Sequence, residues 1–115
     1  MTGQIEAVTR CLVADDHPAL AVVLPTYLEE NGYEVIGPAA DGRAAIELAR
    51  AETPDLALVD YRMPGLGGAE LVERLLEIVP AMRIAVYTAE ADEEIVRELL
   101  AVGAAGLILK EAPLS

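Results

Sequence analysis

Short apolar runs alternate along this chain with longer segments of helical periodicity. Several runs are nearly free of polar side chains, as is typical of strands that are covered on both faces. This pattern predicts five strands, at Arg10–Ala14, Glu34–Ile36, Leu56–Val59, Ile84–Tyr87 and Leu107–Leu109.

The segments between these runs predict four helices. The first spans residues 18–31 and contains Pro25, which should kink it because proline lacks a backbone donor. Asp41 can cap the second helix, and apolar stripes at i, i+3 and i+4 spacing indicate the third and fourth. Gly32 and Gly103 stand where helices end most easily in the left-handed conformation.

The order of the strands can be predicted from their connections. One helix between successive strands makes the strands parallel, and right-handed crossovers then give a doubly wound sheet. Pro38 lies at the second run, and proline is confined to the edges and ends of sheets because it lacks a ladder donor. Of the two common doubly wound orders, 2-1-3-4-5 places the second strand at an edge. We therefore expect a flavodoxin-like α/β fold with a five-stranded parallel sheet in that order.

The length of the chain, 115 residues, indicates one domain with a core of its own, comprising residues 1–115. A fifth helix is expected after Lys110, where it would cover the first and fifth strands, but the sequence stops at Ser115. We expect either that the domain is cut before its last helix or that a partner covers an apolar face.

Charge and composition narrow the function classes. The formal net charge of −12 would repel phosphate backbones and anionic membranes, so we expect no direct binding of nucleic acid or membranes by this chain. No apolar run approaches the roughly 18 residues of a membrane span, and the first ten residues lack the apolar segment of a secretion signal. The single cysteine, Cys11, lies in an apolar run and cannot form an internal disulfide. We expect a cytoplasmic protein.

Reactive polar groups follow four of the five predicted strands. Asp15 and Asp16 follow the first strand, Asp60 the third, Thr88 the fourth and Lys110 the fifth. In an open parallel sheet, ligands bind outside the carboxyl ends of the strands, at the point where the strand order reverses. Since neighbouring strands lie about 4.8 Å apart and the third is central, these groups should converge on Asp60.

This set of groups indicates a chemistry. Three neighbouring carboxylates repel one another unless a cation is present. Oxygen ligands with retained waters and an incoming phosphate are typical of Mg²⁺, and there is no clustered His or Cys for softer metals. A carboxylate, a Mg²⁺ site, a hydroxyl and an ammonium around one point are the parts that phosphoryl transfer needs, with Asp60 as the nucleophile.

Four segments carry a resemblance to a known family: DDHP at residues 15–18, PDLALVDYRMPG at 54–65, YTA at 87–89 and GAAGLILK at 103–110. Together they resemble the receiver domains of two-component response regulators over essentially the whole chain. The DDHP start and the KEAP ending at 110–113 are similar to receivers that carry a C-terminal helix-turn-helix DNA-binding domain.

The resemblance implies a role for each site residue. Asp60 would accept a phosphoryl group from a sensor histidine kinase, a phosphotransfer protein or a small phosphodonor. Thr88 and Lys110 would contact phosphoryl oxygens. The metal would be Mg²⁺, bound directly by Asp16, Asp60 and the backbone carbonyl of Arg62, and Asp15 would orient the site through water.

The same resemblance implies a signalling phosphoacceptor rather than an enzyme, with only self-catalysed phosphotransfer and dephosphorylation. Phosphorylation would switch a protein–protein surface toward an output domain or target protein, or toward homodimerisation. The family's switch uses an aromatic residue three positions before the lysine, where this chain has Leu107, and Tyr87 is a poor substitute because it belongs to a strand.

Other positions also depart from the family pattern or border its site. Gly67 stands where many receivers have an acidic helix cap. Without that cap, the start of the third helix should be less stable. Arg62 and Glu90 border the route of the attacking water and should tune dephosphorylation. His17, beside Pro18 at a helix start, is interpreted as a loop and capping residue rather than a phosphodonor or ligand.

Three alternatives compete with a receiver that controls a DNA-binding output domain. A stand-alone receiver could act as a phosphorelay or interaction module. Phosphohydrolases with an aspartate nucleophile resemble a pattern with a second Asp two residues on, where this chain has Arg62. A flavin carrier of the same strand order would need a Ser/Thr-rich phosphate loop after the first strand, where Asp15 and Asp16 would repel the phosphate.

Overall fold

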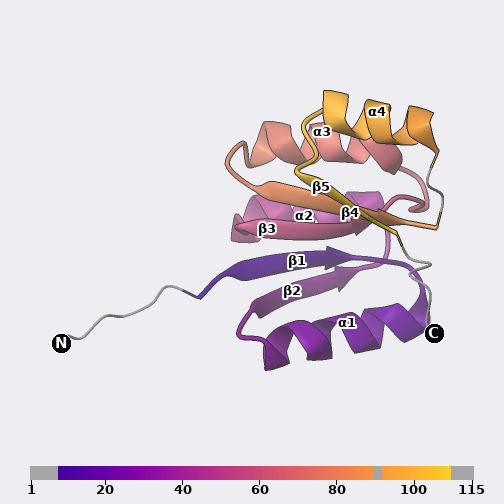
Figure 1. Cartoon of the computed structure of the whole chain (residues 1–115). Coiled ribbons are helices and arrows are strands. Elements are labelled where there is room, and N and C mark those ends of the chain that lie inside the picture. Colours follow the sequence, from indigo (N-terminus) through magenta and orange to yellow (C-terminus); the bar gives the residue numbers. More distant parts are fainter. Residues whose placement is uncertain (1–7, 90–91, 110–115) are drawn as a thin grey trace.

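The computed structural model of the chain describes residues 8–89 and 92–109. Five strands form one sheet in the order β2-β1-β3-β4-β5, and every neighbouring pair is parallel. Figure 1 shows the strand arrows running in one direction across the molecule. The predicted fold class and strand order are confirmed. The strands are β1 (Arg10–Ala14), β2 (Glu34–Ala39), β3 (Leu56–Asp60), β4 (Arg83–Thr88) and β5 (Gly106–Leu109).

The helices cover the two faces of the sheet unequally. They are α1 (Pro18–Glu30), α2 (Gly42–Glu52), α3 (Gly68–Ile78) and α4 (Glu93–Ala101). Alternate residues of β1 belong to two clusters: Leu12 and Ala14 pack with residues of α2, α3 and α4, whereas Cys11 and Val13 pack with α1. Because strand side chains alternate between faces, α1 lies on one side of the sheet and the other three helices on the opposite side.

The edge position predicted for the second strand is confirmed, although β2 is longer than expected. It continues past Ile36 through Pro38 to Ala39. The register between β1 and β2 shifts between Leu12 and Ala14, so that Ala14 pairs with Ala39. Proline is tolerated there because the outer side of an edge strand needs no ladder partner.

The helix ends follow the sequence signals. The carboxylate of Asp41 accepts a hydrogen bond of 2.8 Å from the backbone N–H of Ala44, so it caps α2 as predicted. Gly32 and Gly103 have φ of 92° and 104°, the left-handed conformation that glycine adopts without strain. Helix α1 is continuous across Pro25, and the kink expected there stays a prediction.

Gly67 is the N-cap residue of α3, the position where many receivers have an acidic cap, and it makes no side-chain cap hydrogen bond. A Cβ atom at this position would lie 3.0 Å from both the backbone N and O of Met63. The loop after β3 therefore folds back closely on itself, and this close approach favours a residue without a side chain.

Apolar side chains line a groove on the face of the sheet that α1 covers. A groove of about 260 Å³ lies between α1 and the strands β3, β4 and β5, lined by Leu20, Leu24, Leu58, Tyr87, Ile108 and Leu109. Ile108 is 49% exposed and Leu109 45% exposed. The fifth helix is expected after Lys110, and that part of the chain lies outside the described residues. That the domain is cut before its last helix therefore stays a prediction. Within the described ranges, no helix has the length and apolar character that crossing a membrane requires.

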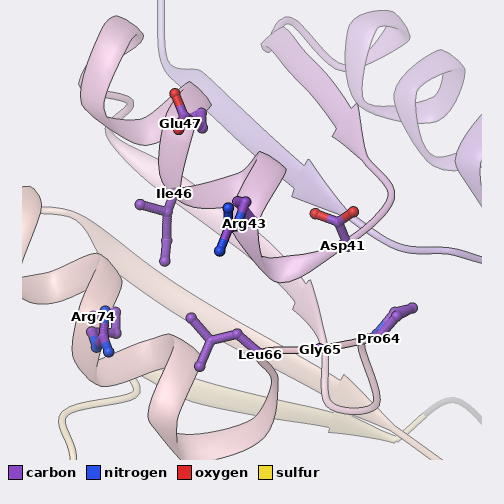
Figure 2. A pocket seen from close by; sticks show the side chains of 8 residues that line it. All are labelled: Asp41, Arg43, Ile46, Glu47, Pro64, Gly65, Leu66 and Arg74. Carbon is purple, nitrogen blue, oxygen red and sulfur yellow. The ribbon is translucent and has the colours of Figure 1, made fainter.

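A second groove, of about 640 Å³, lies where the start of α2 faces the loop after β3, and its side chains carry both signs of charge (Figure 2). Asp41 and Leu66 both line it. At this junction the backbones touch, because a Cβ atom added to Gly42 would overlap the carbonyl oxygen of Leu66. Gly42 therefore allows α2 to pack against the loop that follows β3.

We expect Gly42→Ala to lower the free energy of unfolding by about 1–3 kcal/mol, because the added methyl group must displace the backbone of Leu66. Urea unfolding followed by circular dichroism measures this. Arg43→Ala, at the next and exposed position of the same helix, is the control and should change stability by less than about 0.5 kcal/mol. Equal stability of the two variants would show that the contact is not tight.

The thiol of Cys11 is fully buried, and desolvation raises its pKa to about 11. We expect no reaction with a thiol reagent such as dithionitrobenzoate at pH 8 in the folded protein, and one thiol per chain in denaturant. Because the thiolate forms at lower pH in the unfolded chain, this burial should also make stability fall as the pH rises toward 11. Rapid labelling of the native protein would contradict the burial of Cys11.

Candidate functional site

Two buried carboxylates lie side by side at the carboxyl ends of the inner strands. Asp60 ends β3 and Asp15 follows β1, and the register between these strands pairs Ala14 with Val59. The backbone N–H of Asp15 also donates to the carbonyl of Ala39 at 2.9 Å, which continues the pairing of β1 with β2. Each of the two aspartates is only 1% exposed.

Asp16 completes the acidic group from the more exposed side, with 38% of its side chain accessible. One carboxylate oxygen from each of Asp15, Asp16 and Asp60 lies within 4.8 Å of the others and of a ring nitrogen of His17. The predicted convergence of the three aspartates is therefore present in the structure. Oxygen donors with this spacing fit a hard divalent cation such as Mg²⁺, which would neutralise their mutual repulsion.

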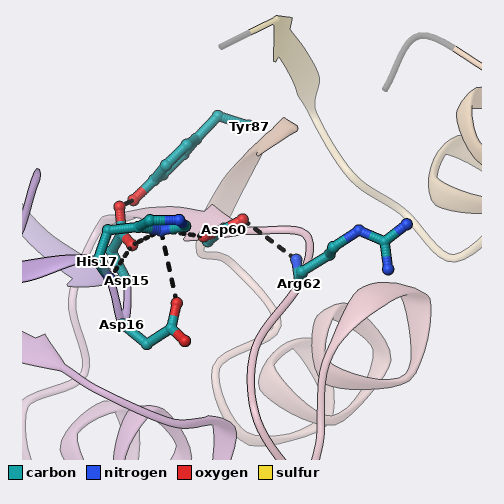
Figure 3. A network of polar contacts seen from close by, with 6 residues as sticks. All are labelled: Asp15, Asp16, His17, Asp60, Arg62 and Tyr87. Carbon is teal, nitrogen blue, oxygen red and sulfur yellow. Dashed lines mark hydrogen bonds and ion pairs between the residues drawn. The ribbon is translucent and has the colours of Figure 1, made fainter. Parts of the chain in front are cut away.

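His17 contributes more than its sequence position suggested. It is the N-cap residue of α1, as expected, but its side chain makes no cap hydrogen bond. Its Nδ1 atom instead lies 3.0 Å from Asp15 Oδ1, 3.3 Å from Asp60 Oδ2 and 3.6 Å from Asp16 Oδ1 (Figure 3). The side chain prefers the carboxylates because they offer a stronger electrostatic partner than the neutral N–H groups of the first helical turn.

Tyr87 also reaches the acidic group, which the sequence interpretation missed. Its side chain is 6% exposed, and its hydroxyl donates a short hydrogen bond to Asp15 Oδ2. Burial raises the pKa of this phenol, and the hydrogen bond and negative charge of Asp15 raise it further. The hydroxyl therefore keeps its proton and stays a donor. A tyrosine in an apolar strand whose neighbours end in acidic residues is a sequence signal for such a contact, because buried phenols need a polar partner.

The loop after β3 holds Asp60 from the other side. The backbone N–H of Arg62 donates to Asp60 Oδ1 at 3.1 Å, and the N–H of Tyr61 donates to the carbonyl of Tyr87 at 2.9 Å. Figure 3 shows the guanidinium of Arg62 directed away from the aspartates. The role predicted for the backbone carbonyl of Arg62 as a metal ligand stays a prediction.

Thr88 lies at the same edge of the sheet. It ends β4, is 2% exposed, and pairs in register with Leu109 of β5. Leu107, at the position where the family has an aromatic residue, lies opposite Val86 and packs against the larger core cluster. The predictions for Lys110 and Glu90 concern positions outside the described residues.

Comparisons with known proteins identify relatives of this chain. A family model described as the response regulator receiver domain matches residues 11–115. The "Probable transcriptional regulatory protein NarL" of Mycobacterium tuberculosis is 39% identical over 104 residues, which cover 90% of this chain and 48% of that protein. The chain spans about half the length of the curated relatives it matches.

Solved structures of response regulators are also similar to this chain. A response regulator receiver domain protein from Methanospirillum hungatei is 31% identical, with a TM-score of 0.86 over 93% of this chain and 85% of that chain. A response regulator from Burkholderia pseudomallei, with a phosphorylated aspartic acid and a calcium ion, is 30% identical. Its TM-score is 0.84, over 92% of this chain and 62% of that chain.

We expect Tyr87→Phe to lower the free energy of unfolding by about 1.5–3 kcal/mol, because it removes a hydrogen bond to a buried charged group. Chemical unfolding in metal-free buffer measures the loss. Tyr27→Phe, which changes a residue that is 61% exposed, serves as the control and should unfold like the wild type. If the two variants are equally stable, the contact between Tyr87 and Asp15 contributes nothing to folding.

Proposed function

The chain belongs to the response regulator receiver domain family, and from that premise we propose that Asp60 is the residue that accepts the phosphoryl group. The observation that supports this choice is the burial of Asp60 at the end of the central strand, with Asp15 and Asp16 within 4.8 Å. Burying a carboxylate without a compensating charge is unfavourable. A cluster of buried carboxylates therefore indicates a site where a cation binds and a reaction takes place.

The two carboxylate oxygens of Asp60 lie in different surroundings. Oδ1 accepts from the backbone N–H of Arg62, whereas Oδ2 faces the acidic cluster and His17. The carboxylate would attack the phosphorus of a phosphohistidine on a kinase. A phosphorus–oxygen bond forms as the phosphorus–nitrogen bond breaks, and the histidine leaves with the electron pair of that bond. Mg²⁺ bound by Asp16, Asp60 and the Arg62 carbonyl would neutralise negative charge during the transfer.

The remaining residues of the site would position metal-bound water and stabilise the phosphoryl group. Asp15 is held by the Tyr87 hydroxyl and by the backbone N–H of His17. It can therefore orient metal-bound water without moving. Thr88, buried at the neighbouring strand end, would donate its hydroxyl to a phosphoryl oxygen, and Lys110 would pair with another.

The output of the phosphorylation is also a proposal, since this chain spans about half the length of the curated relatives it matches. We favour control of a DNA-binding output domain, because the Mycobacterium tuberculosis relative is named a probable transcriptional regulatory protein. A sensor histidine kinase or phosphotransfer protein would be the donor, and phosphorylation could also drive homodimerisation. A cytoplasmic location fits such partners. A stand-alone relay module is the second candidate, because it would use the same acidic site.

A phosphohydrolase is disfavoured by the residue two positions after the nucleophile. That position would hold a general acid, but it holds Arg62, whose side chain is directed away from Asp60 in Figure 3. We therefore regard the chain as a signalling phosphoacceptor rather than an enzyme.

The test uses acetyl phosphate with Mg²⁺, followed by intact-mass analysis. The wild type should gain the mass of one phosphoryl group, and Asp60→Asn should gain none. Asp41→Asn is the matched control, because asparagine caps a helix as well as aspartate does, and it should be labelled like the wild type. Labelling of Asp60→Asn, or a folded wild type that forms neither this adduct nor one with beryllofluoride, would contradict the assignment.

A further inference from the structure

The imidazole of His17 lies over the acidic cluster, with one ring nitrogen close to three carboxylates. Its Nδ1 atom is 3.0, 3.3 and 3.6 Å from oxygens of three different carboxylates. Those oxygens and the nitrogen all lie within 4.8 Å of one another. Figure 3 shows the ring lying over the cluster between Tyr87 and Asp16.

These separations match the spacing of ligands around one metal ion. In six-coordinate geometry with bonds of about 2.1 Å, adjacent ligand atoms lie about 3.0 Å apart and opposite ones about 4.2 Å apart. The distances from Nδ1 to the three oxygens fall near the value for adjacent ligands. A small cation could therefore contact the nitrogen and the carboxylates together after small side-chain adjustments.

The local backbone holds His17 in this place. Its backbone N–H donates to Asp15 Oδ1 at 2.8 Å, and Pro18 begins α1 at the next residue. Proline at the first helical position fixes the direction in which the helix leaves. The side chain of His17 is 56% exposed and that of Asp16 38% exposed, so an ion can enter from solvent without unfolding the sheet.

We propose that His17 is a direct nitrogen ligand of the divalent metal site and makes the site prefer first-row transition ions, such as Mn²⁺ and Ni²⁺, over Mg²⁺. The proposal rests on the metal site of the proposed function. Imidazole suits transition ions, whereas Mg²⁺ is held by oxygen ligands, and affinity rises from Mn²⁺ to Ni²⁺ for a site that includes nitrogen. The neutral ring would offer the Nδ1 lone pair and carry its proton on Nε2.

A competing explanation is that the ring is a positively charged substitute for the metal. The imidazolium would then neutralise the carboxylates and leave when an ion arrives. The two explanations predict opposite effects of removing the ring. Loss of a ligand weakens the binding of transition ions, whereas loss of a competing cation strengthens the binding of every divalent ion.

The first experiment measures the affinities of the 115-residue chain for Mg²⁺, Mn²⁺ and Ni²⁺ by calorimetric titration, without phosphodonor. In His17→Ala we expect Ni²⁺ and Mn²⁺ to bind about tenfold more weakly. The preference for Ni²⁺ over Mg²⁺ should fall by a similar factor. The double variant His17→Ala/Thr26→His is the matched control, because it places one imidazole at an exposed position of α1 outside the cluster of three aspartates, and it should behave like His17→Ala.

The second experiment is pulsed electron paramagnetic resonance of the Mn²⁺-loaded protein. His17 is the only histidine of the chain, so in protein without a histidine tag an imidazole nitrogen coupling can come only from this residue. We expect the coupling in the wild type, and none in His17→Ala or in the double variant. A purely structural role for His17 would not produce this signal.

The outcomes separate this proposal from the proposed function. If the wild type shows no nitrogen coupling, or if His17→Ala binds all three ions more tightly, His17 is not a ligand, while phosphorylation of Asp60 stands on its own test. If the wild type binds no divalent ion and forms no phosphoryl adduct, the metal site itself is absent and both proposals are overturned.

Discussion

The burial of two neighbouring carboxylates at the end of the central strands is the constraint on which this structure depends. Asp15 and Asp60 are each 1% exposed, and like charges in a poorly solvated place are unfavourable unless donors or a cation compensate them. Within the described residues, donors come from different elements, among them the hydroxyl of Tyr87 from β4, a backbone N–H at the start of α1, and a backbone N–H from the loop after β3. The strand order therefore serves electrostatics as well as packing, because it brings these donors together.

The features that could be predicted from sequence are those that follow from strand periodicity and connection. Pro38 indicated an edge strand, and the order that followed made β3 central. In a parallel sheet with that order, the residues that follow β1 and β3 must meet, because both strands end at the same edge. The cluster of Asp15, Asp16 and Asp60 could therefore be predicted without any knowledge of side-chain conformations.

The features that could not be predicted depend on side-chain direction and on contacts between distant segments. His17 occupies a cap position by its place in the chain, but its ring turns to the carboxylates because a stronger partner lies there. Tyr87 belongs to a strand, as expected, and only the length of its side chain lets the hydroxyl reach Asp15. Gly42 shows no sequence signal for its contact with Leu66, because that contact joins α2 to a loop from another part of the chain.

The unequal covering of the two sheet faces has a consequence for how the molecule opens. The face under α2, α3 and α4 holds the larger cluster of buried residues, whereas the cluster under α1 is smaller and contains the buried residues Cys11, Val13 and Leu28. Local opening begins where the least apolar surface is buried, so α1 belongs to the weaker cooperative unit. His17 lies at the start of this helix, and Asp15 adjoins it. Partial unfolding would therefore disassemble one side of the acidic site while β3 and its Asp60 stay folded.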